Sequence, residues 1–338
     1  MNYTKRPLII LGSVVAMLLL ILDAGTALQG AKVGIEIVLG TIVPTLFPFI
    51  YISSIVNRTM GGRQVPFMRW LGKICGIPQG SEILLLLGFT SGYPVGAKMI
   101  NDCCVARQLD IRSARRMLGF CNNAGPAFIF GILLPVFTRP ITVFLLWLVH
   151  VLSAILTAVV LPGKASKCNT CIHRNINGSY HTLLLQAEKA VAEISGLVIL
   201  FRILIAFLDK YILWQLPVTI TTTICGLLEL SNGCIILHEI DCEPLRLIIS
   251  ACMISAGGIC VFLQTVAVTK SIGSGMYLPG KLIQSAMCYI MIVPIAMIIY
   301  RTIPLGVQYS LVAGIPICAL SIVITRNILK KHWKSEKT

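Results

Sequence analysis

The chain is poor in charged residues. Asp, Glu, Lys and Arg make up 12% of its 338 residues, whereas 56% are hydrophobic and the mean hydropathy is +0.87. An ordinary soluble domain carries about 25% charged residues, so the composition excludes a soluble globular protein. We therefore expect an all-α polytopic membrane protein with about eight transmembrane helices of roughly 20 residues each.

Acidic residues are especially scarce, with 13 Asp and Glu against 28 Lys and Arg and a formal net charge of +15. Such an excess could indicate nucleic-acid binding, but the basic residues fall in short segments between apolar runs and not on one soluble face. Membrane orientation is the better interpretation, because basic loops stay on the cytoplasmic side. We expect a lipid bilayer as partner, no nucleic acid, and both termini in the cytoplasm of a multi-pass protein.

Catalytic and metal-binding motifs are missing. The chain has five His residues, no His-rich metal motif and no nucleophile–base pair, so we do not expect an enzyme. The 13 Cys residues are scattered, many within apolar runs, and imply no disulfide framework. Cys168 and Cys171, with His173 and His181 nearby, could ligate zinc, but one Cys pair without a second is a weak signal. The sequence predicts no metal site and no cofactor.

Eight apolar segments are long enough to be considered spans. The first follows Lys5 and Arg6 and resembles a signal peptide, but the chain continues as a bundle of spans, so we expect a helix there. Pro44 and Pro48 should kink the second span. The expected spans cover residues 8–22, 33–56, 119–137, 141–161, 194–213, 247–268, 282–300 and 305–325.

Helix-breaking residues interrupt the apolar pattern at four places. The most marked is Gly88–Lys98, which reads Gly-Phe-Thr-Ser-Gly-Tyr-Pro-Val-Gly-Ala-Lys directly after an apolar run. Broken backbone at membrane depth survives only when it is buried in protein or lines a water-filled cavity. Three further interruptions follow at 121–126, 229–233 and 255–258. The residues expected to break helices are Gly88, Pro94, Gly96, Gly125, Pro126, Gly233, Gly257 and Gly258.

A polar linker near the middle divides the chain into halves of similar plan, and each half contains one polar connector. The connector at 97–116 is strongly basic and is expected to be a helix on the cytoplasmic surface, whereas the one at 234–246 is acidic. The positive-inside rule places them on opposite sides of the membrane. If the first broken segment of each half is re-entrant, the halves form two inverted-topology repeats, as in many secondary transporters. The expected units are an N-terminal helix at 1–32, repeats at 33–162 and 191–325, a cytoplasmic linker at 163–190 and a basic tail at 326–338.

Small polar residues at the four interruptions are the candidate contacts for a solute. The N-termini of half-helices offer unpaired N–H groups and a positive dipole end, which suit an anionic group. Alternatively, these residues only hold helices together, as the spacing of Gly88, Gly92 and Gly96 would allow. The candidate solute-binding residues are Ser91, Gly92, Tyr93, Asn122, Asn123, Ser231, Asn232, Ser255 and Gln264.

Few ionisable residues fall within the apolar segments. Glu229 ends one such run and is the candidate for coupling to Na⁺ or H⁺, unless it faces water near the interface. Arg202 could attract an anionic solute or pair with Glu229. His150 is more typical of a packed histidine, and Lys98 could face the cavity or reach the membrane surface.

The motifs at the four interruptions carry a family resemblance. Gly88–Lys98, the Cys-Asn-Asn-Ala-Gly-Pro at 121–126, the Leu-Glu-Leu-Ser-Asn-Gly at 228–233 and the segment 255–264 together resemble the YlbJ-type sporulation integral membrane proteins. These belong to the nucleoside-recognition or Gate-domain group. The resemblance implies Gate-like repeats and a distant relation to concentrative nucleoside transporters.

Function is implied by the same resemblance. Its members are membrane proteins of spore formers, proposed to pass dipicolinic acid from the mother cell towards the forespore, so the outer forespore membrane is the implied location. Dipicolinate is a planar dianion that suits amides and half-helix N-termini. The alternatives are a nucleoside transporter, or a non-transporting protein of membrane assembly or signalling. The oligomeric state and the coupling ion stay open.

Overall fold

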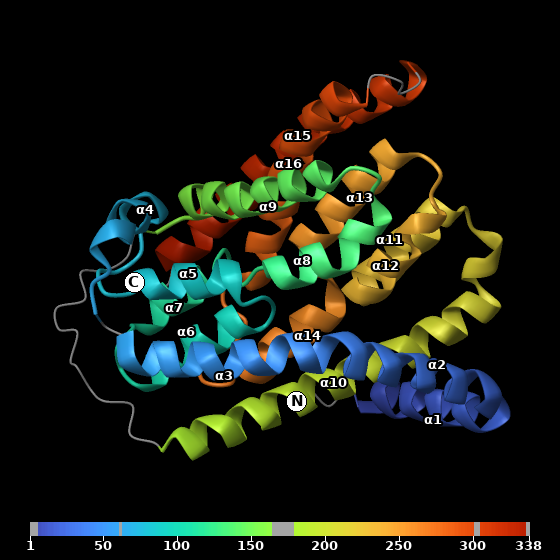
Figure 1. The fold of residues 1–338 in the computed structure, drawn as a ribbon, viewed down its shortest axis with the longest axis horizontal. Coiled ribbons are helices and arrows are strands. Elements are labelled where there is room, and N and C mark those ends of the chain that lie inside the picture. Colours follow the sequence, from blue (N-terminus) through green and yellow to red (C-terminus); the bar gives the residue numbers. More distant parts are fainter. Residues whose placement is uncertain (1–5, 61–62, 164–178, 301–304, 336–338) are drawn as a thin grey trace.

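The computed structural model describes residues 6–60, 63–163, 179–300 and 305–335, and their regular secondary structure is entirely helical (Figure 1). The helices of the first half are α1 (Arg6–Leu22), α2 (Ala24–Ile37), α3 (Val43–Met60), α4 (Arg69–Cys75), α5 (Glu82–Thr90), α6 (Val95–Val105), α7 (Ile111–Met117), α8 (Pro126–Leu133) and α9 (Pro140–Val160). Those of the second half are α10 (Tyr180–Tyr211), α11 (Val218–Leu228), α12 (Leu230–Ile236), α13 (Glu243–Ala256), α14 (Gly258–Val268), α15 (Tyr277–Ile299) and α16 (Leu305–Ser335).

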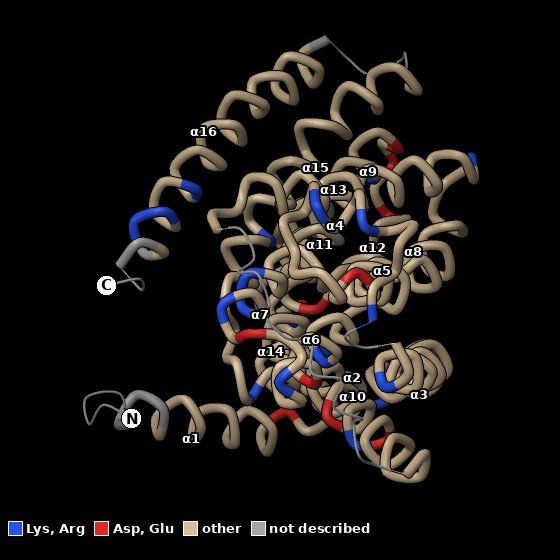
Figure 2. The backbone as a smooth tube through the Cα atoms, turned by 90° about the vertical axis from the view of Figure 1, so that its left-hand side faces the viewer, with Lys and Arg blue, Asp and Glu red and all other residues tan. Residues whose placement is uncertain are grey.

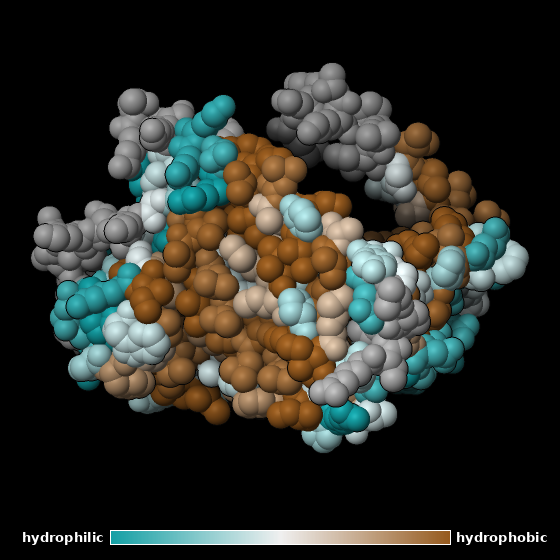
Figure 3. Space-filling view, turned by 90° about the horizontal axis from the view of Figure 1, so that it is seen from above, coloured by the Kyte–Doolittle hydropathy of each residue, from teal (hydrophilic) through white to brown (hydrophobic). Residues whose placement is uncertain are grey.

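Within the described residues, six helical segments are long and apolar enough to cross a membrane. They are Ala24–Met60, Pro140–Val160, Tyr180–Tyr211, Glu243–Val268, Tyr277–Ile299 and Gly306–Lys331. The first and third expected spans correspond to shorter apolar helices, Ile10–Leu22 and Pro126–Val136. The surface is hydrophobic over the middle of the molecule and hydrophilic towards its two ends (Figure 3). The chain is a polytopic all-α membrane protein.

The second span begins earlier than expected and stays continuous despite its prolines. A π-helical turn, η2 (Val38–Ile42), joins α2 to α3, and the N–H of Val43 donates to the carbonyl of Val38. Pro44 has no N–H to donate and its ring would crowd the carbonyl four residues earlier, so a wider turn at this point relieves the conflict. The prolines thus reshape the helix locally without interrupting it.

Two short helical hairpins lie inside the bundle, one in each half. The hairpin α5–α6 lies towards the left of Figure 1 and α11–α12 towards the right, so the two hairpins occupy opposite ends of the long axis. In each half a long helix precedes the hairpin, and an interrupted helix and another long helix follow it. This shared order is expected of two structural repeats, and their inverted orientation stays a prediction.

Pairs of glycines let the arms of each hairpin cross at close range. A Cβ on Gly96 would lie 3.1 Å from the Cα of Gly88, and a Cβ on Gly233 would lie 2.2 Å from the Cα of Gly226. Gly88, Gly96 and Gly233 were expected to break helices, and that expectation is wrong, because all three lie within helices. Their physical role is to remove side chains where two backbones meet.

The helices are interrupted at residues close in sequence to these glycines. Gly92 has a φ of +83°, Pro94 caps α6, and Gly125 caps α8, whose first residue is Pro126. Such a proline needs no hydrogen-bond acceptor in the first turn, so it starts a helix without cost. Gly257 and Gly258 separate α13 from α14 with φ values of +79° and +76°, which favour glycine.

The basic connector at 97–116 is not a surface helix. Its first part is α6, the second arm of the hairpin, and its last part is α7. Arg116 is buried and donates to the backbone carbonyls of Cys75, Gly76 and Ala158. A guanidinium can satisfy several carbonyls at once, so this charge ties α7 to α4 and α9 in place of facing water.

The two ends of the molecule carry opposite charge. Figure 2 looks onto the end where α4, α7 and the last turns of α16 lie, and Lys and Arg predominate there. Five acidic residues lie at the helix ends on the opposite side: Asp23, Asp209, Glu239, Asp241 and Glu243. The positive-inside rule predicts that the basic end is cytoplasmic.

The expected linker and tail are partly helical. Residues 164–178, including Cys168, Cys171 and His173 of the zinc hypothesis, lie outside the described residues. Helix α10 already begins at Tyr180, so it contains the last part of the expected linker. Helix α16 continues to Ser335, so most of the basic tail extends the last membrane helix.

Candidate functional site

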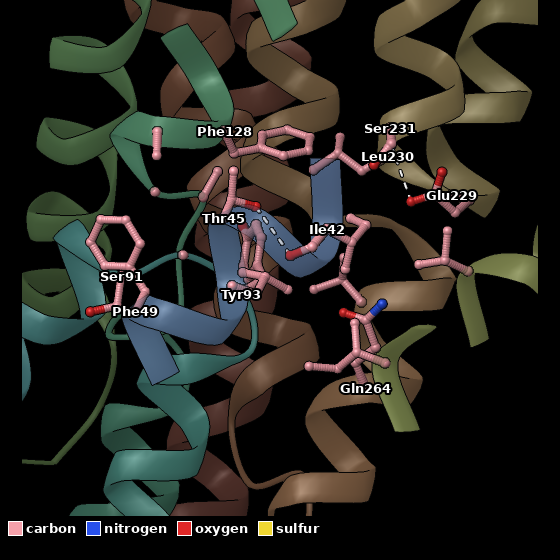
Figure 4. Close-up of a pocket in the computed structure, with 18 of the residues that line it drawn as sticks. Ile42, Thr45, Phe49, Ser91, Tyr93, Phe128, Glu229, Leu230, Ser231 and Gln264 are labelled. Atoms are coloured by element: carbon pink, nitrogen blue, oxygen red, sulfur yellow. Dashed lines mark hydrogen bonds between the residues drawn. The ribbon is translucent and has the colours of Figure 1, made fainter. Parts of the chain in front are cut away.

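A cavity lies in the middle of the bundle, where interrupted segments of both halves meet (Figure 4). Ser91, Gly92 and Tyr93 reach it from the first break, and Ala124 and Gly125 from the second. From the second half come Glu229, Leu230 and Ser231 of the hairpin tip and Gln264 of α14; α3, α8 and α10 supply apolar side chains. The volume is about 50 Å³, which holds only a few water molecules. In this conformation the cavity is therefore too small for a solute with an aromatic ring.

The first hairpin and α3 build one wall of the cavity. The hydroxyls of Ser91 and Ser53 share a hydrogen bond of 2.8 Å, which connects the break to α3. Ser53, Ser54 and Asn57 are all buried, and they form a polar stripe on α3 that the sequence did not mark as functional.

The first and second breaks touch through their backbones. A Cβ on Gly125 would lie 2.8 Å from the nitrogen of Gly92 and 3.1 Å from the carbonyl oxygen of Thr90. The floor of the cavity is thus made of main chain, and only glycine fits there. The glycines of both breaks therefore hold two interrupted segments together beside the cavity.

Glu229 forms the tip of the second hairpin. It is buried, and its carboxylate accepts hydrogen bonds from the N–H groups of Ser231 (3.1 Å) and Asn232 (2.9 Å) and from the Asn232 amide (2.6 Å). The chain turns at this one residue, and Ser231 and Asn232 already belong to α12. Since these donors carry no full positive charge, a carboxylate here remains uncompensated unless a cation or proton joins it.

The predicted pairing of Arg202 with Glu229 is wrong. No ion pair joins the two among the described residues, and Arg202 does not line the cavity. Its backbone lies where α10 crosses α2, within 3.3 Å of a Cβ on Gly30. Lys98 is buried and forms an ion pair with Asp102 at 2.7 Å, so it does not face the cavity either.

Four of the predicted solute contacts are buried but do not line the cavity: Asn122, Asn123, Asn232 and Ser255. Asn122 donates to the hydroxyl of Thr265 on α14 at 2.9 Å, so it joins the two halves. The hydroxyl of Ser255 lies 3.1 Å from the Nδ1 of His150. Sequence spacing alone could not distinguish the residues that line the cavity from buried residues that do not.

A buried polar cluster around Lys281 lies behind the first break. The ammonium of Lys281 donates to the side-chain oxygens of Asn123 (3.0 Å) and Gln284 (2.6 Å), and Gln284 also donates to Asn123 at 2.9 Å. Lys281 is only 2% exposed. The sequence reasoning missed it because the apolar run begins at residue 282, which made this lysine look like a flanking residue. In the structure α15 begins at Tyr277, one turn earlier.

The rings of two tyrosines lie against this cluster. The Lys281 ammonium lies 5.0 Å from the ring centroid of Tyr93 and 5.8 Å from that of Tyr277. The hydroxyl of Tyr93 donates to the carbonyl of Ile254 at 3.0 Å. A Cβ on Gly257 would lie 2.9 Å from the Tyr277 hydroxyl, so the glycine leaves room for the tyrosine. Tyr93 therefore belongs both to the cavity wall and to the cluster.

The chain is similar to a curated protein, the sporulation integral membrane protein YlbJ of Bacillus subtilis (strain 168), with 30% identity over 108 residues. The match covers 30% of this chain and 26% of YlbJ, so the chain spans about a quarter of that relative's length. No protein-family model matches the chain. No solved structure matches it either.

Proposed function

We propose that the chain is a secondary membrane transporter for a small anionic or heterocyclic solute. The observation that carries the proposal is the central cavity, where the first and second breaks and the tip of the second hairpin come together. Secondary transporters built from inverted repeats bind their substrates at such a meeting point of discontinuous helices. The breaks supply hydroxyl, amide and backbone groups that can bind a carboxylate or a ring nitrogen.

Glu229 is the residue proposed to couple transport to an ion. It lines the cavity, is buried and lacks a basic ion-pair partner among the described residues. Binding of Na⁺ or H⁺ would offset its charge as the solute enters. A solute of ten or more atoms needs more room than the present cavity of about 50 Å³, so the cavity must widen when the solute binds.

The physiological setting is proposed from the relative. YlbJ is a sporulation integral membrane protein, and we extend a role in sporulation to this chain. Dipicolinate is then the first solute to test, with the outer forespore membrane as the place of action and the basic end of the molecule facing the cytoplasm. Nucleosides are the second solute class, because the break motifs resemble the nucleoside-recognition group.

Flux measurement in proteoliposomes tests the proposal. Labelled dipicolinate and labelled uridine would be offered separately, with imposed Na⁺ or H⁺ gradients. We expect saturable uptake of one solute that depends on one gradient. Glu229→Gln should abolish the dependence on the gradient, whereas Glu188→Gln, an exposed carboxylate on α10, should behave as the wild type.

A non-transporting role in membrane assembly or signalling gives a different result. In that case the folded wild-type protein moves no solute under any gradient. Substitutions at Ser91 and Glu229 would then lower the thermal stability of the protein, and no variant would transport the solute.

A further inference from the structure

The geometry points to Lys281 as the residue that binds a carboxylate group of the solute, in a subsite that the ring of Tyr93 covers in this structure. This inference deepens the proposed function and rests on it. It assigns a charge-recognising residue that the sequence motifs did not include, and it narrows the solute to one that carries a carboxylate.

The first argument is the state of the charge on Lys281. The side-chain nitrogen is buried, and both of its hydrogen-bond acceptors are neutral amide oxygens, those of Asn123 and Gln284. The ion pairs of the described residues do not involve it. A buried cation without an anion is costly, whereas a carboxylate that arrives with the solute would compensate it.

The second argument is the position of Lys281 behind the cavity wall. The ring of Tyr93 lines the cavity on one side and lies 5.0 Å from the ammonium. An aromatic ring over a cation is a weak partner that a carboxylate can replace. One ring therefore separates the charge from the space in which the solute would bind.

The third argument is how the covering ring is held. Its hydroxyl makes one hydrogen bond, to the carbonyl of Ile254 near the break between α13 and α14. Gly257, in that break, has no side chain to obstruct the ring, and a Cβ added to it would lie 3.4 Å from the Tyr93 hydroxyl oxygen. Rotation of Tyr93 would cost one neutral hydrogen bond, the contact of its ring with Lys281 and part of its core packing, and it would join the subsite to the cavity.

Asn123 makes the subsite testable in two ways. It belongs to the second break, and its side-chain oxygen receives hydrogen bonds from both Lys281 and Gln284. Asn123→Asp would place a permanent carboxylate on the ammonium and compete with the solute, whereas Lys281→Gln would remove the cation. One substitution removes a buried charge and the other adds one, so their effects on folding differ. If one variant fails to fold, the other still tests the Lys281 subsite.

The experiment compares two probes of the same shape: pyridine-2,6-dicarboxylate and its neutral diamide. Binding to purified protein in nanodiscs would be measured by calorimetry for the wild type, Lys281→Gln, Asn123→Asp and the control Lys270→Gln, an exposed lysine that pairs loosely with Glu193 at 3.8 Å. We expect both cluster variants to weaken dicarboxylate binding about tenfold or more, because a hydrogen bond to a charged group is lost. Diamide binding should change less than about threefold, and Lys270→Gln should match the wild type.

The outcomes separate this inference from the proposed function. If the wild type transports a solute but the folded cluster variants keep its preference for the dicarboxylate over the diamide, the Lys281 subsite is refuted and transport stands. If the folded wild type neither binds nor moves either probe or a nucleoside, both proposals fall.

Discussion

Substitution of Gly96 by Ala should destabilise the first hairpin strongly. A Cβ at this position would lie 2.0 Å from the carbonyl oxygen of Cys121, whereas a real contact needs about 3.0 Å, so the two backbones must move apart by about 1 Å. Backbone atoms cannot rotate away as a side chain can. Overpacking of this kind costs about 3 kcal/mol, which corresponds to a fall in Tm of about 6 °C for a chain of this size.

The matched control is Gly131→Ala. Gly131 is also a helical glycine, but a Cβ added to it would have nothing within 4 Å, so the change should raise stability by about 0.5 kcal/mol. Thermal unfolding in detergent can be followed with a thiol-reactive dye, because most of the described cysteines are buried in the native state. Equal Tm values for the two variants would refute the close crossing of α6 with the second break.

Three further results are expected. Glu82→Gln should lower the free energy of unfolding by about 2 kcal/mol, since the buried Glu82 carboxylate pairs with Arg69 at 2.8 Å. The control Glu188→Gln should lower it by less than about 0.5 kcal/mol. Equal losses in the two variants would contradict the pairing. Burial raises the pKa of Cys75 to about 11, so peptide-resolved alkylation at pH 8 should modify it only after unfolding. Because only the unfolded chain then releases this proton, stability should fall between about pH 9 and 11, and less so in Cys75→Ala; an identical fall in both proteins would show that another group titrates.

The membrane-spanning helices could be predicted from the sequence because hydropathy reports them directly. The interrupted segments were also predictable, since Pro126, Gly257 and Gly258 have local conformational requirements that any context must respect. The role of Gly88 and Gly96 was not, because a glycine that admits a second backbone has the same local pattern as one that ends a helix. The two kinds of glycine are distinguished only by a tertiary contact, since the backbone of Cys121 packs directly against both Gly88 and Gly96.

The candidate site was predictable in outline and not in detail. Helix-breaking sequence patterns within the apolar runs are enough to select Ser91, Tyr93 and Ser231, and all three line the cavity in the structure. Lys281 could not be found in this way, because a lysine at the edge of an apolar run normally extends to the membrane surface. Its partner Asn123 lies 158 residues away in the chain, and no local pattern reports such a distance.

The burial of the basic connector has a similar cause. Lys98 and Arg116 lie in a polar segment whose charge predicts a water-exposed helix, yet both are buried. Each charge is satisfied by groups from the surrounding fold: Asp102 for the lysine, and carbonyls of α4 and α9 for the arginine. Charge patterning indicates the side of the membrane only when the charges reach water, so the predicted orientation of this chain depends on the exposed basic residues of α16 and its neighbours.

A structure determined in the presence of a saturating solute would test the central cavity most directly. With dipicolinate bound, we expect density for the ring between Ser91, Ser231 and Gln264, a larger cavity, and the Tyr93 ring rotated away from Lys281 with a carboxylate in its place. Density for the solute elsewhere in the protein, with the cavity unchanged at about 50 Å³, would contradict a transport site at the meeting point of the two halves.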